Sequence, residues 1–146
     1  MFSEKIKTAY HNYVASTTSL QNLSLLLIRL ILAYGFYNPA MMKVTNIDGI
    51  ISWFSSMSIP LPALNAYLAT TTEILGMLLL TIGLGVRVIS IPLIITMIVA
   101  IATVHWSHGF EAGNNGFEIP LYYILMLFAL LTFGAGKYSV DAIAKK

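Results

Sequence analysis

Two charged side chains lie inside long apolar segments of this sequence, where charge is rare. Arg29 stands in LLLIRLILAYG and Glu73 in TTTEILGMLLL. An ionised group in the middle of a membrane costs about 2.5–3.5 kcal/mol on insertion scales, so such groups pair with a partner and commonly serve a function. Helical rise places Arg29 roughly 10 Å and Glu73 roughly 16 Å from the same side of the membrane. We therefore predict that Arg29 and Glu73 face each other as a hydrogen-bonded pair, with the phenol of Tyr34 nearby.

The sequence leaves two roles open for this pair. A buried ion pair can fix the register of two helices without taking part in any chemistry. It can equally orient a polar head group or pass protons.

A second polar cluster lies in VHWSHGFEAGNNGFEIP, with His105, His108, Glu111 and Glu118. We expect a hydrogen bond between His105 and Glu118 across the loop, where it would shape a pocket. His105 and His108 in a His-x-x-His spacing are also weak candidates for a divalent metal site, because no strict zinc motif accompanies them. The ordinary alternative for His108 and Glu111 is a solvated loop position.

The composition is that of a membrane protein. Apolar residues make up 58% of the 146 residues and charged residues 10%, whereas soluble domains have about 45–50% and about 25%. The absence of cysteine excludes disulfides and thiolate metal sites. The net charge of +2 is not clustered, which argues against nucleic-acid binding. No nucleophile triad, phosphate loop or dinucleotide fingerprint is present.

Four segments have about the 20 apolar residues that a membrane-crossing helix needs, at 23–42, 62–84, 86–106 and 118–136. They predict an all-α fold, an integral membrane four-helix bundle with short interfacial helices. Apolar residues at helical spacing predict those surface helices in 1–22 and 47–57. They are Phe2, Ile6, Tyr10, Tyr13 and Val14 in the first segment, and Ile47, Ile50, Ile51, Phe54 and Met57 in the second.

Basic residues predict the orientation. Four crossings place six of them on one side, namely Lys5, Lys7, Arg87, Lys137, Lys145 and Lys146, and leave Lys43 on the other. The positive-inside rule then makes both termini cytoplasmic, in the inner membrane of a bacterium. We expect a cytoplasmic segment 1–22, a transmembrane domain 23–141 and a cytoplasmic tail 142–146.

A series of short motifs in a fixed order resembles the DoxX family of small four-helix membrane proteins. The order is Arg29, Lys43 fourteen residues later, and then PLP, EILG, GLGVR, VHWSHGF, GFEIPL and GAGKYSVD. The resemblance runs from about residue 23 to residue 141. It implies a subunit of a membrane redox system, linked to a quinone as cofactor and to a protein partner in a membrane complex.

The sequence offers no cysteine, haem-ligand pattern or iron–sulfur motif of its own. Electron transfer would therefore need a bound quinone or a partner protein. Two other functions stay open, a non-catalytic membrane scaffold that recruits a partner enzyme, and a small transporter or metal-handling protein.

Overall fold

The computed structural model describes residues 2–144, and their side chains from Glu4 onward. Predictions that involve the side chain of Phe2, Lys145 or Lys146 lie outside this part. The described chain is helical and has no strand, which confirms the all-α class. Its α-helices are α1 (Phe2–Ser19), α2 (Gln21–Thr45), α3 (Ile47–Ser56), α4 (Pro62–Ile82), α5 (Val86–Ala100), α6 (Glu118–Phe133) and α7 (Val140–Ile143).

Three helical stretches are long and apolar enough to cross a membrane, Glu4–Thr45, Pro62–Ile82 and Val86–His108. The fourth, α6, is equally apolar but has 16 residues. It ends at Phe133, earlier than predicted, because Gly134 takes a positive φ of 83°. The third stretch changes its winding near the end, where a π-helical turn (Ile101–His105) and a 3₁₀ turn (Trp106–His108) follow α5.

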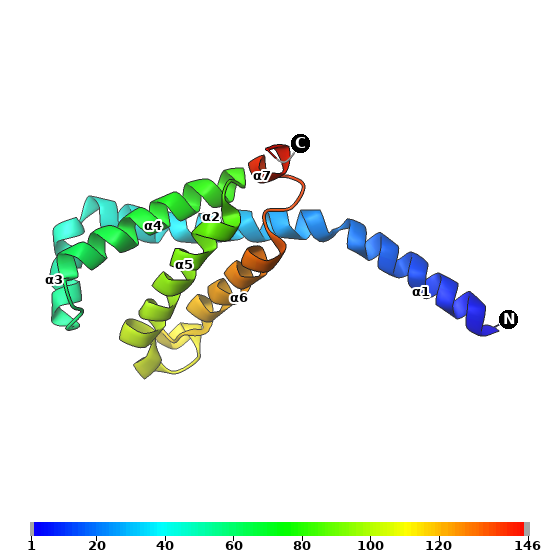
Figure 1. The fold of residues 1–146 in the computed structure, drawn as a ribbon. Helices are drawn as coiled ribbons and strands as arrows, with labels where there is room; N and C mark the ends of the chain where they lie inside the picture. The colour runs from blue at the N-terminus through cyan, green and yellow to red at the C-terminus, as the bar shows by residue number, and fades with distance from the viewer. Residues whose placement is uncertain (1, 145–146) are drawn as a thin grey trace.

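The bundle consists of two helix pairs, α2 with α4 and α5 with α6. Contacts between α4 and α5 join the two pairs. Figure 1 shows α5 and α6 side by side and inclined to α2 and α4. The buried core draws on all four helices, with Leu32, Phe36, Leu80, Leu93 and Leu127 among its fully or almost fully buried side chains. Gly76 allows the close approach of α4 and α5, because a Cβ there would press into the side chain of Leu93.

Helix direction gives the bundle two ends. The start of α2, the turn between α4 and α5 and residues 134–141 meet at one end, which we name the clasp end. The α3 helix and residues 101–117 belong to the other, the loop end. At the loop end, Asn46 accepts a hydrogen bond from the backbone N–H of Gly49 at the start of α3, and Pro62 opens α4, the position where proline suits a helix.

The α1 helix stands apart from the bundle. Figure 1 shows it extending away from α2 beyond a one-residue break at Leu20. Every side chain described between Glu4 and Leu20 is exposed.

Candidate functional site

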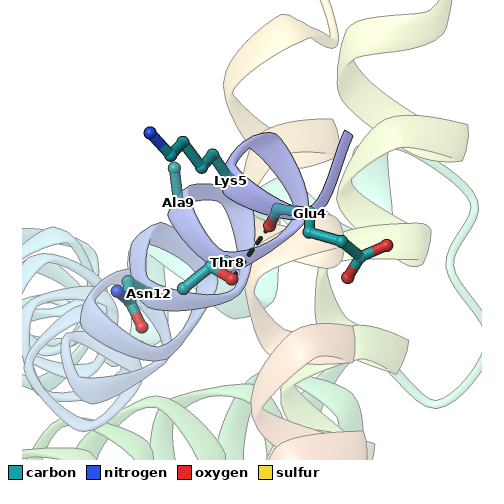
Figure 2. Close-up of a pocket in the computed structure, with 5 residues that line it drawn as sticks. All are labelled: Glu4, Lys5, Thr8, Ala9 and Asn12. Carbon is teal, nitrogen blue, oxygen red and sulfur yellow. Dashed lines mark hydrogen bonds between the residues drawn. The ribbon is translucent and has the colours of Figure 1, made fainter. Parts of the chain in front are cut away.

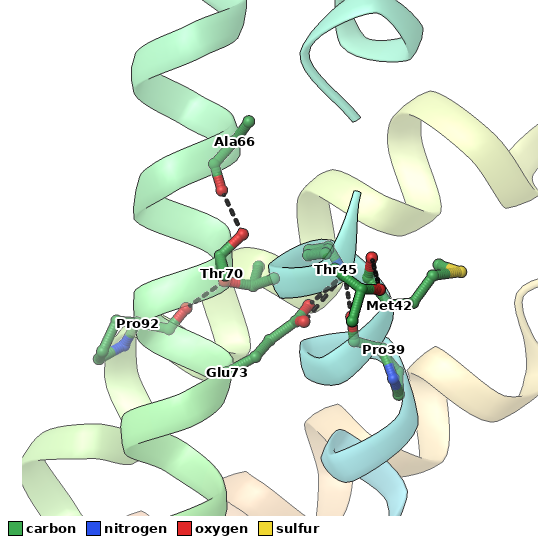
Figure 3. Close-up of polar contacts among 9 residues, drawn as sticks. Pro39, Met42, Thr45, Ala66, Thr70, Glu73 and Pro92 are labelled. Carbon is green, nitrogen blue, oxygen red and sulfur yellow. Dashed lines mark hydrogen bonds and ion pairs between the residues drawn. The ribbon is translucent and has the colours of Figure 1, made fainter. Parts of the chain in front are cut away.

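The most buried charged pair of the described residues joins α2 to α4. Nζ of Lys43 lies 2.8 Å and 3.0 Å from the two carboxylate oxygens of Glu73. Lys43 is 9% exposed and Glu73 is 2% exposed. Figure 3 shows the Glu73 side chain reaching from α4 toward the last turns of α2, near Pro39 and Thr45. Two short hydrogen bonds between ionised groups form a strong contact in surroundings with little water.

The predicted partner of Glu73 was therefore wrong, since Lys43 and not Arg29 neutralises it. Side chains on a helix lean toward the N-terminus of their own helix. Because α2 and α4 run antiparallel, Arg29 leans toward the clasp end and Glu73 toward the loop end. Lys43 leans back along α2, with Nζ 3.5 Å from the carbonyl of Pro39, and so meets Glu73.

Lys43 was missed as a site residue because its charge suggested that the first span ended at residue 42. The helix instead continues to Thr45 and carries Pro39 in its interior. The spacing of Arg29 and Lys43 was the available signal. Fourteen residues are close to four helical turns, about 21 Å along the axis, and place both on nearly the same face.

One polar side chain lies beside the pair on α4. Thr70 stands one turn before Glu73 and is buried, and its hydroxyl donates a 2.7 Å hydrogen bond to the carbonyl of Ala66. Because residues three apart share a helix face, Thr70 extends the polar line from Glu73 toward the loop end.

Arg29 is fully buried at the clasp end. Its Nη2 donates to the carbonyl of Tyr138, and its guanidinium lies against Gly83. Within residues 2–144 no carboxylate reaches ion-pair distance of Arg29, and its Nε and Nη1 are buried without a hydrogen-bond partner. Asp141 is the nearby charge that acts on it electrostatically. Arg29 thus anchors the C-terminal segment by a backbone carbonyl.

Further contacts hold residues 134–141 at this end, among them a 3.0 Å hydrogen bond from the N–H of Asp141 to the carbonyl of Gly83, and together with Arg29 they form what we name the clasp. The side chain of Asn22 accepts a 2.8 Å hydrogen bond from the N–H of Lys137. The carboxylate of Asp141 accepts from the N–H groups of Gly85 at 2.8 Å and Val86 at 3.3 Å, where α5 begins. Asp141 is thus the acidic cap of α5, which local sequence could not reveal because it lies 55 residues further along the chain.

At the loop end, the structure does not join His105 to Glu118, so that prediction was wrong. Nδ1 of His105 lies 2.7 Å from the carbonyl of Asn115. The Glu118 carboxylate instead accepts from the N–H of Ala112 at 3.0 Å and the hydroxyl of Tyr122 at 2.9 Å. Both side chains close the same loop, but each does so through a local partner, since backbone groups exposed by the tight loop lie nearer.

His108 bonds within its own helical turn, with Nδ1 3.0 Å from the carbonyl of Val104. No group of three metal-ligating side chains gathers among residues 2–144. Aromatic rings pack against each other in this region, where the ring centroids of Trp106 and Phe117 lie 5.5 Å apart in a stacked arrangement.

Tyr34 lies on the outward face of α2 and is 74% exposed. It precedes Lys43 by nine residues, which is about two and a half turns of the helix, so that the two face opposite ways. Tyr34 borders a shallow apolar hollow with Leu27 and Ile31. A second open hollow lies on the polar face of α1, where Figure 2 shows Glu4, Thr8 and Asn12. Neither hollow includes Glu73.

Comparison with known proteins identifies the family. The family model described as DoxX matches residues 24–106. The chain belongs to the DoxX family. The DoxX match covers α2, α4 and α5 and therefore includes Arg29, Lys43 and Glu73. The family resemblance inferred from the motifs is thereby confirmed, and the chain is a multi-pass membrane protein in contact with the lipid bilayer.

Two curated relatives of this DoxX protein cover most of its length. An uncharacterized protein of Haemophilus influenzae is 31% identical over 131 residues, which is 84% of each chain. A Bacillus subtilis (strain 168) protein named "Putative oxidoreductase CatD" is 32% identical over 102 residues, 70% of this chain and 71% of the relative. No solved structure matches the chain.

Proposed function

We propose that this chain is a membrane subunit of a quinone-linked redox system, in which the Lys43–Glu73 pair binds a quinone head group and exchanges protons with it. The observation that carries this proposal is the pair itself, sealed between α2 and α4 and almost completely buried. Ionisable groups inside a membrane protein commonly mark a proton or ligand pathway. The oxidoreductase name of the Bacillus subtilis relative supports the redox class.

The pair suits the chemistry of a quinone. Reduction to the quinol takes up two electrons and two protons, one at each carbonyl oxygen. The ammonium group of Lys43 can donate a hydrogen bond and then a proton to one quinone oxygen, and the carboxylate of Glu73 can take up a proton from water and pass it to the quinone, so that both protons of the quinol are supplied. Thr70 continues this polar line toward the loop end. The electrons would come from a partner protein, because the sequence has no cysteine for an iron–sulfur cluster.

The orientation we propose places the clasp end in the cytoplasm of a bacterium, with the protein in the inner membrane. The clasp end carries Arg87 and Lys137, and the α1 helix that leads into it carries Lys5 and Lys7. Lys43 is buried in an ion pair and no longer counts as a loop charge. The positive-inside rule therefore favours this orientation more strongly than the sequence count alone did.

A scaffold that recruits a partner enzyme is the second candidate. It is favoured by the completeness of the pair, because both carboxylate oxygens of Glu73 already accept from Lys43 and need no ligand. In that case the pair fixes helix register only.

Quinone binding separates the two candidates. Wild-type protein in lipid nanodiscs, titrated with decylubiquinone and with menadione, should bind one of them, and Glu73→Gln should weaken binding at least tenfold. The Lys43→Leu/Glu73→Leu double variant should accumulate normally but not bind. Tyr34→Phe, on the opposite face of α2, is the matched control and should bind as wild type does. Failure of the wild type to retain or bind any quinone, together with normal recovery of partner proteins by the double variant, would favour the scaffold.

A further inference from the structure

The α1 helix has two different faces. At 100° per residue, Ile6, Tyr10, Tyr13 and Val14 fall within an arc of roughly 100°. These four side chains are between 38% and 66% exposed, so no part of the described bundle covers them. The opposite face carries Glu4, Thr8 and Asn12, which Figure 2 shows together. An apolar stripe of this kind on a free helix needs an apolar surface to lie on.

Because α1 continues almost directly into α2, the position of α2 determines which surface lies next to the apolar stripe. Only Leu20 separates α1 from α2, and Asn22 already contacts the clasp. The stretch Glu4–Thr45 has 42 residues, about 63 Å of helix, whereas the hydrocarbon core of a bilayer is about 30 Å thick. Since α2 crosses the membrane, the C-terminal end of α1 must lie at the bilayer surface.

The residues along the stripe fit a lipid surface with anionic head groups. Tyr10 and Tyr13 have apolar rings and polar hydroxyls, as residues at the membrane interface commonly do. Lys7 borders the stripe, whereas Lys5 lies on the polar face beside Glu4 and Thr8. Long lysine stems can lie along the apolar surface while their ammonium groups reach phosphates. The existing contact of Lys7 with Glu4 is fully exposed, and such pairs contribute little.

The junction with α2 allows the necessary bend. Ser16, Thr17, Thr18 and Ser19 each donate a side-chain hydrogen bond to a carbonyl three or four residues earlier. Such bonds slightly destabilise and bend helices. With the turn at Leu20, they form a hinge about which α1 can turn toward the membrane plane.

We propose that α1 is a surface anchor that lies on the bilayer at the clasp end, with its apolar stripe in the lipid and Lys7 on anionic head groups. The inference is independent of quinone binding, because it uses no residue of the Lys43–Glu73 site.

Spin labels test this inference on the full-length protein, and the natural absence of cysteine makes single-site labelling clean. Tyr10→Cys and Tyr13→Cys report the stripe, while Thr8→Cys and Asn12→Cys are the matched controls on the polar face. In phosphatidylglycerol-containing nanodiscs, the stripe labels should be more accessible to oxygen than to a water-soluble nickel complex, and the control labels should show the reverse. In the Lys7→Gln background this contrast should shrink at least twofold, whereas Glu4→Gln should preserve it.

Two results would overturn the inference. Equal access of the nickel complex to all four labels would mean that α1 stands in water. Strong spin–spin broadening at position 10 in discs that hold two copies would mean that a second copy covers the stripe. A Tyr10→Trp variant in a Trp53→Phe/Trp106→Phe background gives an independent measurement, because brominated lipids should quench its single tryptophan in the bound state and leave it unchanged if α1 stays in solution.

Discussion

Two buried cations of the same helix, Lys43 and Arg29, are accommodated in different ways. Lys43 meets a carboxylate, and its charge and that of Glu73 cancel. Arg29 has no ion pair within the described chain, bonds to the carbonyl of Tyr138 and leaves two of its nitrogens without a partner. The first arrangement joins two helices by opposite charges, while the second holds the C-terminal segment by a backbone group. A charged residue in an apolar segment therefore indicates an important contact, but only its partner shows whether it joins two helices or anchors a chain segment.

Breaking the Lys43–Glu73 pair should have the largest effect. Lys43→Leu should lower the free energy of unfolding by about 3–5 kcal/mol, because Glu73 then stays buried without a counter-charge. Adding Glu73→Leu should recover most of that loss, since two apolar side chains can replace a buried pair. Unfolding measured in bicelles gives both values. If the losses of stability in the two single variants add up to the loss in the double variant, the two side chains do not interact.

Displacing Arg29 by a substitution at Gly83 should have the second-largest effect on stability. Gly83→Ala places a methyl group in collision with Nη1 of Arg29, and also with Cβ of Ser139, at a residue with φ of 75°. Gly85→Ala is the matched control, because Gly85 also has a positive φ of 58° but has nothing within 4 Å of a Cβ. The backbone strain of about 1–2 kcal/mol is common to both variants. We expect Gly83→Ala to lose about 2 kcal/mol more, from the displaced guanidinium. The same unfolding assay checks this, and equal losses would remove Arg29 from the account of the clasp.

Weakening the acidic cap of the clasp should cost less. Asp141→Asn keeps the shape of the side chain but removes its charge at the N–H groups of Gly85 and Val86. We expect a loss of about 1 kcal/mol. Asp48→Asn on the exposed start of α3 should cost about half of that or less. Thermal unfolding of both variants in the same nanodiscs makes the comparison, and a larger effect for Asp48→Asn would contradict it.

The loop end should show the smallest effect, because its carboxylate is exposed. Glu118→Gln weakens the hydrogen bond from the N–H of Ala112, and exposure limits the effect to about threefold faster exchange of that amide. Glu111→Gln is the control, since its side chain bonds only to Asn114. Hydrogen exchange measured at Ala112 gives the answer, and unchanged protection in Glu118→Gln would show that the carboxylate does not hold the loop.

Local sequence properties predicted the helices well and their contacts less well. Hydropathy placed α2 and α4 within a few residues, and the proline at residue 62 marked the start of α4. The partner of Glu73 depended on the direction in which side chains lean and on the antiparallel packing of α2 and α4. Asp141 depended on a contact with residues 55 and 56 positions earlier. No periodicity records such distant contacts, so the clasp could be found only in three dimensions.

The position of Lys43 shows where sequence reasoning can be improved. Its charge was taken as the end of the first span, although the apolar spacing allows the helix to continue to Thr45. A charged residue at such a position should be tested against every opposite charge in the other spans before it is assigned to a loop. For this chain that test has one acidic partner in the interior of a span, Glu73, because Glu118 is the first residue of the fourth span and the remaining acidic residues lie outside the spans.

The most direct test of the central contact is a dipolar recoupling measurement between ¹⁵Nζ of lysine and ¹³Cδ of glutamate, by solid-state NMR in lipid. The Glu4→Gln background removes the exposed contact with Lys7. Strong dephasing should appear in this protein and vanish in Lys43→Arg, whose side chain carries no lysine label. Absence of dephasing, combined with dephasing between labelled arginine and Glu73, would contradict the account and restore the Arg29–Glu73 pair.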